Sequence, residues 1–191
     1  MKISFGLLIT ISIILVSCNQ GLTPKEKETY TAKGKEIAQV TFKRMAGEVE
    51  NNMKEGGVSQ AAPYCNAHAS DLTAEMEGKF NVDIKRTSLK LRNESNAASE
   101  EEKAVLEQFE SMIAKGEEIM PFVELDAEGL PHFYAPIKLK SKCVACHGVL
   151  GETMKQETDS IIKILYPNDQ AIGFKEGDLR GIWSIAFKEK E

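Results

Sequence analysis

The sequence has no surplus of positive charge. Its 191 residues contain 24 Lys and Arg against 29 Asp and Glu, which gives a formal net charge of −5. An acidic surface argues against binding to nucleic acid and against electrostatic adhesion to anionic lipid, because both require a basic face. We therefore expect no nucleic-acid partner.

The residue patterns of common enzymes are also missing. No nucleophile triad, phosphate-binding loop or pair of catalytic carboxylates stands out in the sequence. The acidic runs "GEVENN" and "SEEEK" are interpreted as solvated helix faces. Internal repeats and low-complexity segments are absent as well. We therefore expect a single domain that is not an enzyme.

Long apolar runs are absent after the first sixteen residues. Met1 and Lys2 form a short basic start, and the apolar run that follows, 3–16, is too short to span a bilayer comfortably and is typical of an export signal. The sequence Leu-Val-Ser-Cys that ends at Cys18 resembles a bacterial lipobox, in which the Cys thiol is acylated and becomes the new N-terminus. The alternative is an ordinary cleaved signal with an incidental Cys.

We therefore expect a lipoprotein signal peptide over 1–17, a tether over 18–23 and one domain over 24–191. Removing the leader leaves 23 basic against 29 acidic residues, a net charge of about −6, and a chain long enough for a sizeable core. The expected location is outside the cytoplasmic membrane, where the protein is exported, held by lipid and facing the periplasm or the cell exterior.

Cysteine is scarce, and its spacing is informative. Besides Cys18, the chain has Cys65 alone and Cys143 and Cys146 in the run Cys-Val-Ala-Cys-His, which ends at His147. A redox dithiol is disfavoured because no βαβ pattern surrounds the motif. A structural zinc site needs four ligands, and a second Cys pair is absent, although Cys65 would complete a Cys3His set.

Covalent haem is the third interpretation and the one we favour. Two thiols at i and i+3 reach both vinyl groups of a porphyrin, and the adjacent His147 reaches the iron. The expected export also suits a c-type haem. The sequence therefore predicts one covalently bound haem c.

Hydrophobic periodicity predicts helices first and strands later. Thr23, Pro24 and Glu26 form a capping-box start for a long helix that Gly56 and Gly57 end. The other expected helices are a second one over 59–77 that Gly78 ends, a third capped by Ser99 and closed by Gly116, and a short one over 158–165. The expected strands are 82–86, a hairpin of 121–125 and 132–137, and 181–187. This order indicates an α+β fold with an antiparallel sheet.

Four segments together resemble a known family. They are "AAPYCNAHA", "RTSLKLRNESNAAS", "FYAPIKLKSKCVACHG" and "YPNDQAIGFKEGDLRGIWSI". They are similar to the Tll-like family of exported bacterial domains, which carry a single c-type haem on a PAS-like core and were long described as a domain of unknown function. The resemblance spans roughly 24–188 and implies a PAS-like antiparallel sheet with long N-terminal helices.

The resemblance also implies the second iron ligand, because known members pair His with a Cys thiolate. It points to His147 and Cys65. From the residues alone, Cys65 is a soft ligand candidate or a buried inert thiol. His68, one turn from Cys65, is the alternative ligand; His132 and the methionines are less favoured.

Arginines in the matching segments are candidates for the haem propionates, since a guanidinium pairs well with a carboxylate. They are Arg86, Arg92 and Arg180. The alternative is that they bond turn carbonyls or Asp178. Tyr64 and Tyr134 are expected at the haem edge, although packing alone would explain both.

Two functions follow from a His/Cys haem. The first is one-electron transfer by a lipid-tethered carrier to an unidentified redox partner. The second is a haem-based redox or gas sensory module that acts through a signalling partner. Because no kinase, cyclase or transmembrane segment is found in the sequence, we favour electron transfer. A haem-free zinc protein is the outside alternative.

Overall fold

The structure is a computed structural model that describes residues 21–190. The expected signal peptide, 1–17, and the expected lipidation site, Cys18, lie outside the described residues. Within residues 21–190, no helix is both long enough and apolar enough to cross a membrane.

The chain begins with the long helix α1 (Pro24–Gly56). Its start is the predicted capping box, in which the Thr23 hydroxyl accepts from the N–H of Glu26 and the Glu26 carboxylate accepts from the N–H of Thr23. The helix ends at Gly57, whose φ of 65° lies in the left-handed region that favours glycine. The predicted extent of this helix is therefore confirmed.

Helix α2 (Val58–Phe80) follows after a single residue and packs along α1. The predicted end of this helix at Gly78 is wrong. The helix continues through Gly78 because Met76 and Phe80, one turn apart, both pack into the core. It ends instead at Asn81, which adopts φ 53° and whose N–H bonds the carbonyl of Glu77.

Four strands form one antiparallel sheet. They are β1 (Val82–Thr87), β2 (Phe122–Leu125), β3 (Pro131–Lys138) and β4 (Leu179–Phe187). Their order is β1-β4-β3-β2, so the last strand of the chain lies in the centre between β1 and β3. The remaining helices are α3 (Glu100–Ala114), α4 (Val144–His147) and α5 (Gln156–Leu165).

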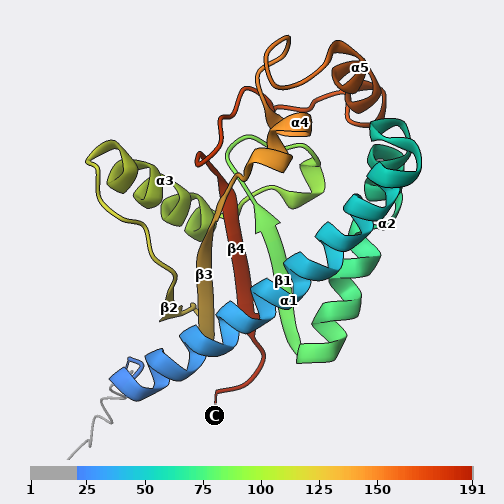
Figure 1. Cartoon of the computed structure of the whole chain (residues 1–191). Helices are drawn as coiled ribbons and strands as arrows, with labels where there is room; N and C mark the ends of the chain where they lie inside the picture. The colour runs from blue at the N-terminus through green and yellow to red at the C-terminus, as the bar shows by residue number, and fades with distance from the viewer. Residues whose placement is uncertain (1–20, 191) are drawn as a thin grey trace, which may run out of the picture.

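The helices cover opposite faces of this sheet, as Figure 1 shows. α1 and α2 bury one face, where Phe133, Trp183 and Ile185 lie in a common core with both helices. α3 buries the other face, where Phe109 packs against Ile182. The expected α+β class, with long N-terminal helices and an antiparallel sheet, is confirmed.

The short helix α4 lies beyond one end of the strands and contacts α5, which in turn packs on α2 (Figure 1). β3 leads into this region and β4 leaves it. The far half of α1 also reaches it: Lys140 Nζ lies 5.3 Å from the Phe42 ring centroid, and Lys142 Nζ lies 3.8 Å from a Glu50 carboxylate oxygen. The segments that meet around α4 are therefore distant from one another in sequence: the C-terminal half of α1, the end of β3, α5 and the start of β4.

Candidate functional site

The Cys-Val-Ala-Cys-His motif lies on a 3₁₀ turn, Ser141–Cys143, and on α4, in agreement with the predicted loop and short helix. Spacing of three residues places Cys143 and Cys146 on the same side of this turn. Both thiols are free and half-buried, and so is Cys65. The motif therefore presents two thiols that remain accessible for covalent bonding.

The imidazole of His147 is held by the loop 169–174. Its Nδ1 lies 2.8 Å from the carbonyl oxygen of Ala171. Because a carbonyl can only accept, Nδ1 carries the proton and donates it. The N–H groups of Gly173 and Phe174 bond the carbonyls of Gly148 and His147, which fastens the loop to α4. Nε2 is then left as an unprotonated lone pair, as an iron ligand requires.

The charge state of His147 agrees with this assignment. Burial, followed by the nearby guanidiniums of Arg92 and Arg180, lowers the pKa of His147 to about 3, and the hydrogen bond to Ala171 opposes the shift. The ring is therefore neutral at physiological pH. The side chain nevertheless keeps some accessible surface.

Cys65 approaches this region from α2. Burial raises the pKa of Cys65, the neighbouring thiol of Cys146 raises it further, and the guanidiniums of Arg86 and Arg92 oppose the shift. Burial likewise raises the pKa of Cys146, with Arg92 lowering it and Cys143 raising it. The effect of Cys146 on Cys65 places the Cys65 thiol in the electrostatic neighbourhood of the motif. Its predicted role as an iron ligand stays a prediction.

Arg92 connects the motif to the 169–174 loop. Its Nε and Nη2 donate to the two carboxylate oxygens of Asp169 at 3.2 and 3.1 Å. The same Nη2 donates to the carbonyl of Cys146 at 2.6 Å and of Ala171 at 3.3 Å. These contacts give Arg92 a role within the protein; its predicted pairing with a haem propionate stays a prediction.

Arg86 and Arg180 differ from Arg92 because neither has a carboxylate partner among residues 21–190. Arg86 contacts the ring of Trp183, and Arg180 contacts the ring of Phe174 while its Nη1 donates to the carbonyl of Lys90. Burial lowers the pKa of both, that of Arg180 to about 10. We considered above that these arginines bond backbone carbonyls and not haem propionates. Among Arg86 and Arg180, this applies only to Nη1 of Arg180, which bonds the carbonyl of Lys90.

His68 points away from this group. Its side chain is 51 % exposed, its ring centroid lies 4.6 Å from that of Tyr64 with the two rings tilted by 40°, and its Nδ1 lies 3.9 Å from Asp71 Oδ2. Tyr64 and His68 both lie near Glu48 of α1. The Arg44 guanidinium lowers the pKa of Glu48 most, and Tyr64 and His68 lower it further. This placement favours Cys65 over His68 as the ligand from α2.

Tyr134 requires a correction, because the structure does not bring it to the site. It is buried on the α3 face of the sheet with Phe109 and Ile182, whereas Arg86 and Trp183 lie on the α1–α2 face. Its ring stacks on His132, whose Nε2 hydrogen-bonds the hydroxyl of Ser184 at 2.7 Å. Packing, the alternative explanation, accounts for Tyr134, and His132 also lies away from the motif.

Sequence reasoning missed several residues of the site. Asp169 pairs with Arg92, the carbonyl of Ala171 orients His147, and Trp183 contacts Arg86. Tyr166 also lies here: burial raises its pKa, a hydrogen bond from Asn66 opposes the shift, and Cys65 contributes. All four occur in the segment "YPNDQAIGFKEGDLRGIWSI", whose family resemblance was the only available signal, because nothing local connects Asp169 to Arg92.

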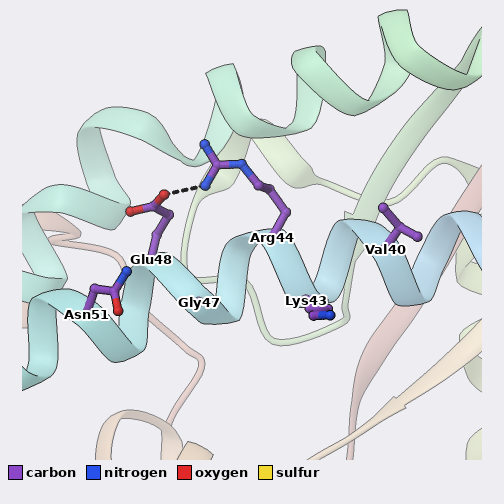
Figure 2. Close-up of a pocket in the computed structure, with 6 residues that line it drawn as sticks. All are labelled: Val40, Lys43, Arg44, Gly47, Glu48 and Asn51. Carbon is purple, nitrogen blue, oxygen red and sulfur yellow. Dashed lines mark hydrogen bonds and ion pairs between the residues drawn. The ribbon is translucent and has the colours of Figure 1, made fainter.

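A surface pocket lies elsewhere, on the exposed side of α1. Figure 2 shows its lining and the Arg44–Glu48 ion pair, and none of its residues is a predicted site residue. Within residues 21–190, no three His, Cys, Asp or Glu side chains converge as ligands of a bare metal ion. The Cys3His zinc site considered above is therefore not formed.

Comparison with known proteins gives two results. The model of a family described as Tll0287-like matches residues 24–187. The fold is similar to the crystal structure of the cyanobacterial heme-protein Tll0287, with a TM-score of 0.61, 21 % sequence identity and coverage of 89 % of this chain and 99 % of that chain. No curated protein matches the chain.

Proposed function

This chain belongs to the Tll0287-like family, and we propose that it binds one haem covalently and transfers single electrons. Cys143 and Cys146 would form the thioether bonds, and His147 and Cys65 would be the two protein ligands of the iron. The solved structure with the same fold is that of a heme-protein, which supports the choice of cofactor.

The observation that carries this proposal is the state of His147 together with the nearby Cys65. The Nδ1–H of His147 donates a hydrogen bond to the carbonyl of Ala171, and its neutral ring leaves Nε2 as a lone pair. Cys65, on α2, lies near enough to Cys146 for that thiol to raise its pKa. One nitrogen ligand and one thiolate from two different elements can hold an iron between them. A redox dithiol would need neither the neutral His147 nor the third thiol of Cys65.

The charges of the site also fit a haem. Arg92 forms an ion pair with the buried carboxylate of Asp169, which also acts electrostatically on Arg180. Neither Arg86 nor Arg180 forms an ion pair with a carboxylate among residues 21–190, and a haem has two propionates. We propose that Arg86 and Arg180 pair with them, since partly buried cations gain most from such partners.

When bound, the haem would supply a one-electron Fe(III)/Fe(II) couple, held at low potential by a thiolate ligand. Two protein ligands leave no position for a substrate, which is why we propose a carrier rather than an enzyme. The electron partner would be a separate protein. We further propose a lipid anchor at Cys18, six positions before the start of α1.

The test is the optical and EPR spectrum of the full-length protein matured in a host that attaches c-type haem. We expect a pyridine haemochrome of a doubly thioether-linked haem and a ferric low-spin signal with thiolate ligation. A colourless protein would refute the proposal. A Cys143→Ser/Cys146→Ser variant is the matched control and should lose the covalent haem.

The same sample separates electron transfer from sensing. We expect the reduced protein to resist carbon monoxide, because both axial positions are filled. Rapid carbon monoxide or nitric oxide binding would instead favour the sensory module.

A further inference from the structure

Within the loop 169–174, three hydrogen bonds converge on Ala171. Its N–H donates to Asp169 Oδ1 at 2.9 Å, and its carbonyl accepts from both Arg92 Nη2 and His147 Nδ1. Ala171 is completely buried. The carbonyl of Ala171, which orients His147, is therefore held in place through both the N–H and the C=O of its residue.

Arg92 and Asp169 supply this fixation as one unit. The Asp169 side chain is 3 % exposed and the Arg92 side chain 17 %, so the bidentate pair is largely shielded from water. Arg92 reaches the carbonyls of Cys146 and Ala171 with the same nitrogen, on either side of His147. Backbone bonding of Gln170 N–H to the carbonyl of Leu91 brings the two segments together at the same place.

We propose that Arg92 and Asp169 are positioning residues that set the orientation and tautomer of the His147 ring. They form a clamp, defined by the Arg92–Asp169 pair and its contacts to Cys146 and Ala171. The clamp holds α4 and the loop at the separation that the His147–Ala171 hydrogen bond needs. It acts on His147 through Ala171 and does not touch the iron itself. The clamp deepens the proposed function, since the His147 Nε2 that it frees is the proposed iron ligand.

Chemistry explains why a guanidinium is needed here. Two coplanar nitrogens of the guanidinium, Nε and Nη2, pair with the two oxygens of the Asp169 carboxylate, while Nη2 also lies within hydrogen-bond distance of both carbonyls. A lysine keeps the charge but has a single nitrogen, so it cannot keep the two-nitrogen contact to both oxygens of Asp169 that sets the direction of the side chain. Partners that orient a ligating His commonly change metal affinity by 10- to 100-fold when they are removed.

The test uses Arg92→Lys in the full-length protein, with Arg44→Lys as the matched control, because Arg44 forms an ion pair on the surface of α1. The readout is the ring Nδ1–H of His147 in the 15N-labelled reduced protein: its nitrogen shift and its rate of exchange with solvent. We expect Arg92→Lys to speed that exchange about 10-fold or more, and Arg44→Lys to leave it unchanged.

A second variant, Asp169→Asn, keeps an oxygen for the Ala171 N–H but loses the charged pair, so we expect a smaller increase. The backbone N–H of Ile185, buried in β4, reports general loosening. The proposal is overturned if the His147 ring proton exchanges at the wild-type rate in both folded variants. It is also overturned if that rate increases only by the same factor as the exchange rate of the Ile185 backbone N–H.

The readout also separates this proposal from the proposed function. If the wild-type protein contains no haem, the haem assignment fails, but the clamp is still tested, because the ring nitrogens then report the tautomer directly. In that case we expect Nδ1–H in the wild type and a mixture of tautomers in Arg92→Lys. A mixture in the wild type would overturn the clamp.

Discussion

The guanidinium of Arg86 lies over the indole ring of Trp183, 5.8 Å from its centroid, and pairs with no carboxylate among residues 21–190. A cation over an aromatic face recovers about 0.5–2 kcal/mol, less than full hydration provides. Burial lowers the pKa of Arg86, which indicates that the charge is poorly solvated. Such a charge is costly until an anion arrives.

Arg86→Gln should therefore have opposite effects on the free energy of unfolding of the haem-free and the haem-containing protein. In the Cys143→Ser/Cys146→Ser background, which cannot attach haem, we expect the free energy of unfolding to rise by about 1 kcal/mol. In the haem-containing protein we expect it to fall by about 1–3 kcal/mol, because a propionate loses its partner. Urea titration of all four proteins measures both differences.

The control for this comparison is Arg44→Gln, which removes an ion pair within α1 that involves no residue of the motif. It should change stability by less than about 1 kcal/mol in both backgrounds. The same sign for Arg86→Gln in both states would contradict the propionate role.

Cys65→Ala should keep the covalent haem and change its spectrum, since the thioether bonds come from other cysteines. Loss of a thiolate ligand should also raise the midpoint potential. His68→Ala is the matched control on the same helix and should leave the spectrum unchanged, because His68 faces Tyr64 and Asp71. A clearly positive midpoint in the wild type, or a spectral change in His68→Ala alone, would rule out Cys65 as the ligand.

Gly34→Ala should destabilise the protein, although alanine usually favours a helix by up to about 1 kcal/mol. A Cβ at Gly34 would overlap the ring of Phe133, so α1 lies against β3 more closely than any other residue allows. We expect a loss of about 1–3 kcal/mol in urea unfolding. Gly47→Ala, on the same helix with open space around it, should instead stabilise by a few tenths to 1 kcal/mol.

Stability should fall on mild acidification because of His132. Burial lowers the pKa of His132 in the folded protein, while nearby Glu102 partly opposes the shift. The unfolded chain therefore binds the proton first, so this contribution is complete above about pH 6.5 and is lost as the pH falls below it. One such proton gives a slope of at most about 1.4 kcal/mol per pH unit.

The measurement is urea unfolding at pH 7.5 and 5.5 for the wild type and for His132→Gln, which retains a polar group near Ser184. We expect a smaller loss of stability in the variant than in the wild type. An equal loss in both proteins would show that His132 is not the group responsible.

Local sequence predicts the features that depend on neighbouring residues. The capping boxes at Thr23 and Ser99 are both present, and alternation, a hairpin turn signal and a final apolar run together identify all four strands. The end of α2 could not be predicted because tertiary packing of Phe80 outweighs the helix-breaking tendency of Gly78.

In the candidate site, too, the features set by neighbouring residues could be predicted, whereas those set by tertiary contacts could not. The spacing of Cys143, Cys146 and His147 is local and is presented by α4 as expected. The Arg92–Asp169 pair spans 77 positions and has no local pattern. Alternation places Tyr134 on one face of a strand but does not say which helix covers that face, and this is why its assignment to the haem edge was wrong.

The length of α1 determines how far this protein can extend. At 1.5 Å per residue, the 33 residues of α1 span about 50 Å, and the stretch from Pro24 to Glu50, beside the haem motif, covers about 39 Å of it. A lipid anchor at Cys18 would therefore hold the iron at the tip of a rigid stalk, up to about 40 Å above the headgroups. Electrons would then be exchanged with donors and acceptors that project equally far from the bilayer or diffuse freely, and not with carriers dissolved in the lipid.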